Sequence, residues 1–172
     1  MRLTAATLVE NSRAPVKPTR DMVVEHRQTL RLGDASVDII PTPGHTPGTL
    51  SLIFPVKDGK QVHRAAIWGG TGFNSRTEEQ FTTYAASAEM FAKLAKAAKV
   101  DVPLSNHPIV DHSFAKIEAL QQRKAGQTHP FVTGPASQQN LLTVGAQCAY
   151  ASRLSAAAAS SSAETAPPAS AR

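Results

Sequence analysis

Residues 37–54 read VDIIPTPGHTPGTLSLIF, in which a stiff loop with one histidine separates two apolar segments. The flanking segments, 37–40 and 50–54, are rich in β-branched and large apolar residues, which favour strands. Proline fixes φ, and glycine adopts backbone angles closed to other residues. The pattern therefore predicts that His45 is held at the edge of a sheet. A loop histidine is most often only solvated, but a metal ligand or a catalytic base needs this kind of support.

The sequence on either side extends this pattern into layered α/β structure. Gly33-Asp34 marks a hairpin turn, and Thr77 followed by acidic residues and Gln80 has the form of a helix capping box. Apolar residues then recur every three or four positions, as on one face of a long helix. The predicted strands are 22–24, 29–32, 36–40, 49–54, 61–68 and 100–104, and the predicted helices are 77–98, 113–126 and 137–154.

Composition divides the chain into three parts. Residues 1–20 contain two prolines and little periodicity, which predicts an irregular lead-in, and 21–154 carry all of the predicted elements. From 155 to 172 the chain is mostly Ala, Ser, Pro and Thr without a large apolar residue, which predicts a disordered tail. Strands followed by helix, strand and two helices make a layered α/β fold.

The string Pro43-Gly44-His45-Thr46 between two strands resembles the third metal-ligand motif of the metallo-β-lactamase fold hydrolases. The resemblance continues through 68–73 and 104–108 and covers roughly residues 20 to 150. It matches only the C-terminal half of that family's domain. The resemblance therefore implies half of a four-layer αββα sandwich, a mostly antiparallel sheet with helices on its outer face.

The resemblance assigns zinc ligands to two histidines. His45 corresponds to the ligand that completes the first zinc site, and His107, in Ser105-Asn106-His107-Pro108, corresponds to the last ligand, which binds the second zinc. An intact domain would hold two zinc ions. Many members have Gly-Asp where this chain has Gly69-Gly70-Thr71, and in those members the Asp bridges the two metal ions. The lack of this Asp resembles the β-lactamase subclass whose second zinc takes only Asp, His and His.

The family's N-terminal His-x-His-x-Asp-His motif does not occur in this sequence, so no catalytic residue is assigned. In 107–112, HPIVDH, Ile109 replaces the middle histidine, and Asp111 and His112 are interpreted as loop or helix-start residues. His26, His63 and His129 have no partner at recognisable spacing and are interpreted as surface residues. Because a catalytic zinc site needs three protein ligands, two histidines alone should bind zinc weakly.

The leading interpretation is a fragment of a zinc-dependent hydrolase, which is expected to be inactive on its own because its active site is incomplete. The intact reaction implied by the resemblance is attack of a zinc-bound hydroxide on an amide, lactam or ester carbonyl of a small molecule. The alternative is a non-catalytic half-domain that pairs with a complementary N-terminal half or with itself.

Composition limits the other possibilities. A net charge of +5 with scattered basic residues and 5% aromatics gives no support for a nucleic-acid partner, and no apolar run approaches a membrane span. The single cysteine, Cys148, is expected to be a small buried apolar residue. If Met1 is the true start, the protein is expected in the cytoplasm; if an N-terminal half with a signal is missing, the periplasm or secretion becomes possible.

Overall fold

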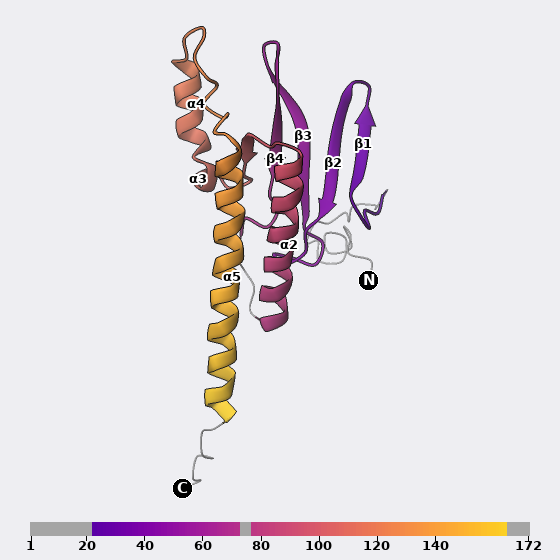
Figure 1. Cartoon of the computed structure of the whole chain (residues 1–172), viewed down its shortest axis with the longest axis vertical. Helices are drawn as coiled ribbons and strands as arrows, with labels where there is room; N and C mark the ends of the chain where they lie inside the picture. Colours follow the sequence, from indigo (N-terminus) through magenta and orange to yellow (C-terminus); the bar gives the residue numbers. More distant parts are fainter. Residues whose placement is uncertain (1–21, 73–76, 165–172) are drawn as a thin grey trace, which may run out of the picture.

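Within residues 22–72 and 77–164, which the computed structural model describes, five strands form one sheet whose strand order follows the chain (Figure 1). The first four strands are antiparallel neighbours, and the last lies parallel to the fourth. The sheet is therefore mostly antiparallel, as predicted. The strands are β1 (Gln28–Leu32), β2 (Ala35–Pro41), β3 (Leu50–Asp58), β4 (Gln61–Ile67) and β5 (Val102–Leu104).

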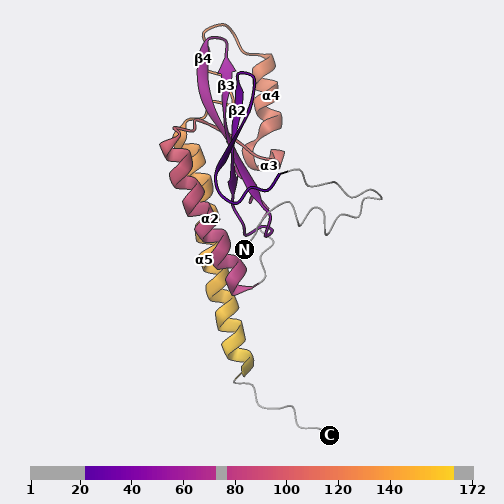
Figure 2. The same cartoon turned by 90° about the vertical axis from the view of Figure 1, so that its right-hand side faces the viewer.

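Two long helices cover one face of this sheet (Figure 2), and two short helices lie beyond its β5 edge without covering the other face (Figure 1). The long helices, α2 and α5, pack along each other (Figure 1). This is the layered α+β arrangement that the sequence predicts. The helices are α2 (Glu78–Ala97), α3 (Pro108–Asp111), α4 (Ser113–Gln121) and α5 (Pro135–Glu164).

The core lies between the sheet and the two long helices. Alternate residues of the strands point toward the helices, as the twofold repeat of a strand requires. Ile40, Ile53 and Ala66 are buried there against Phe91 of α2 and Leu142 of α5. The helix-facing side of the sheet thus provides a rigid support for the loops at the strand ends.

The capping box predicted at Thr77 is confirmed. The Gln80 amide donates to Thr77 Oγ1 at 3.2 Å, and the Thr77 amide donates to Gln80 Oε1 at 3.2 Å. Glu78 and Glu79 lie in the first turn, where a negative charge interacts favourably with the helix dipole. The start of α2 is therefore encoded locally, in residues three positions apart.

The predictions for α5 need two corrections. Cys148 is exposed, not buried, because the buried face of α5 contains Leu142, Ala146 and Ala149, and a residue adjacent in sequence lies about 100° away around a helix. The helix also begins at Pro135 and continues to Glu164, so 155–164 are helical where a tail is predicted. The remaining tail residues and the lead-in 1–20 lie outside the described residues.

Other local predictions also differ from the structure. Residues 22–24 form no strand. Ser113 is the first residue of α4 and not its cap; His112 takes the cap position in a left-handed conformation, with φ of 55°. The predicted apolar side of α4 is exposed, with Phe114 at 70% and Ile117 at 45%. The apolar stripe on α4 therefore has no covering partner within the described residues.

The sheet face turned away from α2 and α5 is partly open. Apolar side chains line a hollow of about 770 Å³ over β1, β2 and β3. Cross-strand pairs put Leu30 beside Val37 and Phe54 beside Ala65, so one alternating set of residues forms this face. The lining residues include Leu30, Val37, Leu52, Phe54 and Ile67.

Gln138 is an unusual core residue in α5. It is 0% exposed, and both polar atoms of its side-chain amide have no hydrogen-bond partner within the described residues. An unpaired buried amide costs roughly 1–3 kcal/mol, so Gln138→Met, which keeps an unbranched chain of similar length, should raise the free energy of unfolding by about 1 kcal/mol. Chemical denaturation measures this change.

The neighbouring glutamine is a matched control. Gln139 Nε2 donates to the Ala92 carbonyl oxygen at 3.0 Å, so Gln139→Met removes a hydrogen bond and should lower the free energy of unfolding by about 1 kcal/mol. The same substitution at adjacent positions thus has opposite signs. A loss of stability with Gln138→Met would mean that its amide has a partner.

Candidate metal-ligand edge

Three loops meet at one edge of the sheet. β2, β4 and β5 end there and β3 begins there, since β2 and β4 both run antiparallel to β3 and β5 runs parallel to β4. The loops are 42–49, which carries His45, 68–72, which is rich in glycine, and 105–107, which ends at His107. The two histidines that the sequence predicts as zinc ligands therefore lie on loops of the same sheet edge.

Internal hydrogen bonds stiffen the loop of His45. The Thr42 amide donates to the Thr49 carbonyl oxygen at 2.9 Å, which closes the base of the loop. Within it, the Thr46 amide donates to Thr49 Oγ1 at 2.9 Å. Thr42 and Ser51 share a buried hydroxyl contact of 2.7 Å, and Ser51 Oγ accepts the Gly69 amide at 3.0 Å. These bonds join the His45 loop to the start of the glycine-rich loop.

The imidazole of His45 lies against Gly72. A Cβ at position 72 would lie 2.8 Å from Cε1 of the ring, so a larger residue there would require the imidazole to shift. His45 is half-buried, and its Nδ1 is buried without a hydrogen-bond partner in the described part of the chain. Among the described residues Nδ1 therefore has no donor or acceptor facing it, which leaves this nitrogen available to a metal ion.

His107 is exposed and occupies the cap position of the short helix α3. Its amide donates to Ser105 Oγ at 3.0 Å, and Ser105 Oγ donates to Thr71 Oγ1 at 3.4 Å. This chain of contacts links the His107 loop to the loop beside His45. Among the described residues, however, no group of three or more His, Cys, Asp or Glu side chains is placed to hold a metal ion.

Asp111 has a structural role in the described chain. It is 8% exposed, and its carboxylate accepts the amides of Ser105 at 2.8 Å and Ser113 at 3.0 Å. The Ser113 hydroxyl also donates to it. Asp111 thus holds the turn between β5 and α4, in agreement with the interpretation of Asp111 as a helix-start residue, while the adjacent His112 is exposed.

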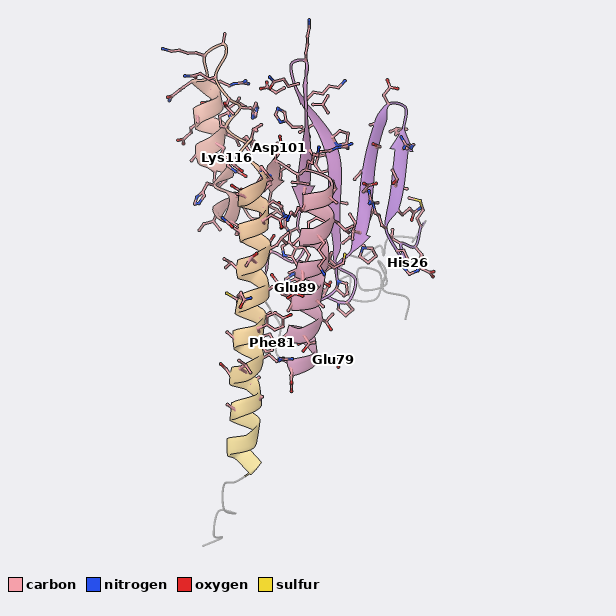
Figure 3. All side chains as sticks on the ribbon, viewed as in Figure 1. His26, Glu79, Phe81, Glu89, Asp101 and Lys116 are labelled. Atoms are coloured by element: carbon pink, nitrogen blue, oxygen red, sulfur yellow. The ribbon has the colours of Figure 1, made fainter. Side chains whose placement is uncertain are left out.

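His63 is a correction to the sequence analysis, because it is not a surface residue. Its Nδ1 lies 2.6 Å from Asp101 Oδ2, and its Nε2 is buried without a partner in the described residues. Burial raises the pKa of the Asp101 carboxyl, but hydrogen bonds from His63 and the Arg64 amide outweigh that effect, so this pKa lies below its usual value. Figure 3 labels Asp101 near the C-terminal end of α2, away from the loops described above.

Asp101 also receives backbone hydrogen bonds from the chain before α5, because its carbonyl oxygen accepts the amides of Thr133 at 3.1 Å and Gly134 at 3.0 Å. The His63–Asp101 pair therefore joins β4 to the segment between the helices. His129 is half-buried as well, against Phe131. Of the three histidines predicted at the surface, only His26 is exposed; it lies on the β1 side of the sheet (Figure 3).

Similar solved structures are metallo-β-lactamases. BJP-1, a subclass B3 enzyme of Bradyrhizobium japonicum, is 26% identical, with a TM-score of 0.64 over 81% of this chain and 52% of its own. FEZ-1 from Legionella gormanii is 21% identical, with a TM-score of 0.69 over 90% and 61%. The di-zinc class B3 enzyme LRA-12 from an Alaskan soil metagenome is 16% identical, with a TM-score of 0.62 over 87% and 60%.

The chain therefore has the metallo-β-lactamase fold and resembles its C-terminal half, as the motif around His45 predicts. It spans between 52% and 61% of the length of these three enzymes. No protein-family model and no curated protein sequence matches it. In the described residues, no helix has the length and apolar character needed to cross a membrane.

Proposed function

We propose that this chain is the C-terminal part of a zinc-dependent hydrolase of the metallo-β-lactamase superfamily, and that His45 and His107 are its zinc ligands. The observation that carries the proposal is the environment of His45: a half-buried imidazole on a hydrogen-bonded loop, with its Nδ1 unpaired among the described residues. Neutral imidazole is a preferred zinc ligand. One ligand for each of two zinc ions, on loops at the same end of the sheet, fits part of a two-zinc site and not a whole one.

The other ligands would come from an N-terminal segment with the His-x-His-x-Asp-His motif. When bound, zinc supplies Lewis acidity and lowers the pKa of a water molecule, which suits hydrolysis of an amide, lactam or ester. This chain's contribution is to orient two imidazoles. The loop bonds from Thr46 to Thr49 hold the first, and the Ser105 hydroxyl holds the backbone before the second. The chain alone would therefore bind zinc weakly and hydrolyse little.

The open apolar face supports the same proposal. In a two-sheet sandwich this face packs against the other sheet, so the hollow over β1–β3 is where the remaining half of the domain would lie. A non-catalytic pairing module would use the same face, but the similar structures are enzymes by their titles. We therefore favour the hydrolase.

A complementation experiment tests the proposal. The part of BJP-1 that this chain does not match is produced together with the full chain, and also joined to it as a covalent chimera. Zinc content by mass spectrometry and hydrolysis of a chromogenic β-lactam are measured, and both should exceed those of the chain alone. A soluble, folded chimera without zinc would contradict the assignment of His45 and His107.

Size-exclusion chromatography with light scattering distinguishes the alternative. If the chain alone forms a stable dimer that excludes the N-terminal part, pairing of two copies through the open face becomes the better explanation. A complex of one chain with one N-terminal part supports the hydrolase instead.

A further inference from the structure

Tyr84, on the buried side of α2, connects to the glycine-rich loop through its hydroxyl. The side chain is 4% exposed. Its hydroxyl donates to the Gly70 carbonyl oxygen at 2.7 Å and accepts Trp68 Nε1–H at 3.4 Å. The two rings meet edge to face, with centroids 5.8 Å apart. Burial raises the pKa of the Tyr84 hydroxyl, so this O–H remains a donor at neutral pH.

The backbone at Tyr84 supports the second loop, which carries His45. Gly44 has φ of +141°, and a Cβ there would lie 2.5 Å from Tyr84 Cα, so only glycine allows this approach. One turn further along α2, Ser87 Oγ donates to the Pro43 carbonyl oxygen at 2.6 Å. Gly44, directly before His45, therefore packs against the same turn of α2 whose Tyr84 side chain holds the glycine-rich loop.

Both sides of the His45 side chain are thus fixed by Tyr84. Its backbone limits where Gly44 lies, and Gly44 sets the position of the His45 main chain. Its hydroxyl holds Gly70, which is two residues before Gly72. Gly72 lies against the imidazole so closely that a Cβ built on it would come within 3.2 Å of Nδ1. The Tyr84 hydroxyl, the Trp68 indole N–H and the Gly70 carbonyl form one buried hydrogen-bond network. Removal of the hydroxyl would leave the indole N–H and the carbonyl without this partner.

We propose that Tyr84 is a positioning residue for the His45 imidazole. It holds the ring orientation through Gly70 and Gly72 without touching a metal ion. This inference rests on the proposed function where it concerns metal affinity, but the effect on the ring itself can be measured without metal.

The chain contains one other tyrosine, which gives a matched control. Tyr150 OH donates to Glu89 Oε1 at 2.7 Å, so it also bonds to α2, but on the exposed side between the two long helices. Tyr84→Phe and Tyr150→Phe each delete one hydroxyl. Only Tyr84→Phe should alter the loops at the candidate site.

Two measurements on the full chain test the proposal. The first is a cobalt(II) titration followed by absorption, repeated with His45→Ala to define the signal that depends on His45. Tyr84→Phe should bind cobalt at least about tenfold more weakly, because that is the usual effect of losing a group that orients a metal ligand. Carbon–proton NMR of the histidine rings without metal should show a shifted or broadened His45 resonance in Tyr84→Phe. Tyr150→Phe should leave both unchanged.

The outcomes separate this inference from the proposed function. If the wild-type chain binds cobalt through His45 and Tyr84→Phe binds equally well, Tyr84 does not position the ring. If neither the wild-type chain nor its complex with the N-terminal part shows a His45-dependent cobalt signal, the proposed metal function fails, and the NMR result alone decides the positioning role. An unchanged His45 resonance in Tyr84→Phe overturns the inference in either case.

Discussion

Replacing His45 by alanine should remove the specific metal binding of this chain. Removing a group that only orients a ligand costs about 10–100-fold in metal affinity, and removing a ligand should cost more, so His45→Ala should weaken cobalt or zinc binding by more than about 100-fold. Because the chain alone supplies only two ligands and binds weakly, isothermal titration of its complex with the N-terminal part measures this change, and so does the zinc content of that complex. The fold should survive, because His45 makes no hydrogen bond through its buried Nδ1 to a described residue.

The six histidines of the chain provide the controls. His26→Ala removes an exposed imidazole on the β1 side of the sheet and should leave affinity unchanged (Figure 3). His107→Ala should weaken binding as His45→Ala does. Binding that persists in His45→Ala but is lost in His63→Ala would move the metal to the His63–Asp101 pair, where Nε2 of His63 also has no partner among the described residues.

Those features that depend on neighbours in sequence could be predicted before the structure. The Thr77 capping box needs only residues three positions apart, and both of its hydrogen bonds form. The strand, loop and strand around His45 follow from proline, glycine and β-branched residues within one short segment. The metallo-β-lactamase fold was predicted from the resemblance of this segment, together with 68–73 and 104–108, to that family.

Pairings between distant residues could not be predicted from spacing. His63 and Asp101 are 38 positions apart, and only the parallel pairing of β4 with β5 brings them together. Cys148 was predicted to be buried, but the adjacent Ala149 is buried instead. The sequence of α5 has small or apolar residues around much of the helix and does not show which side meets α2. The contacts of the Tyr84 hydroxyl could not be predicted either, since the helical spacing predicts only that Tyr84 lies on the apolar face.

Gly69→Ala should destabilise the protein more than an ordinary surface change. A Cβ at position 69 would lie 2.0 Å from the Leu50 carbonyl oxygen and 3.0 Å from Thr49 Cγ2. The nearest atom is backbone at the start of β3, and Leu50 cannot move far without breaking its pairing with β2. We expect a loss of about 3 kcal/mol or more in the free energy of unfolding, measured by urea denaturation.

The same substitution at Gly145 should have the opposite sign. Gly145 lies inside α5, where a Cβ would make ordinary contact with the Tyr84 hydroxyl at 3.4 Å. Because alanine is a better helix former than glycine by roughly 0.5–1 kcal/mol, Gly145→Ala should stabilise the chain slightly. If Gly69→Ala instead folds with wild-type stability, then the glycine-rich loop does not approach β3 as closely as described. The loop would then be held by the hydrogen bonds to Ser51 and Tyr84 and not by close packing at Gly69.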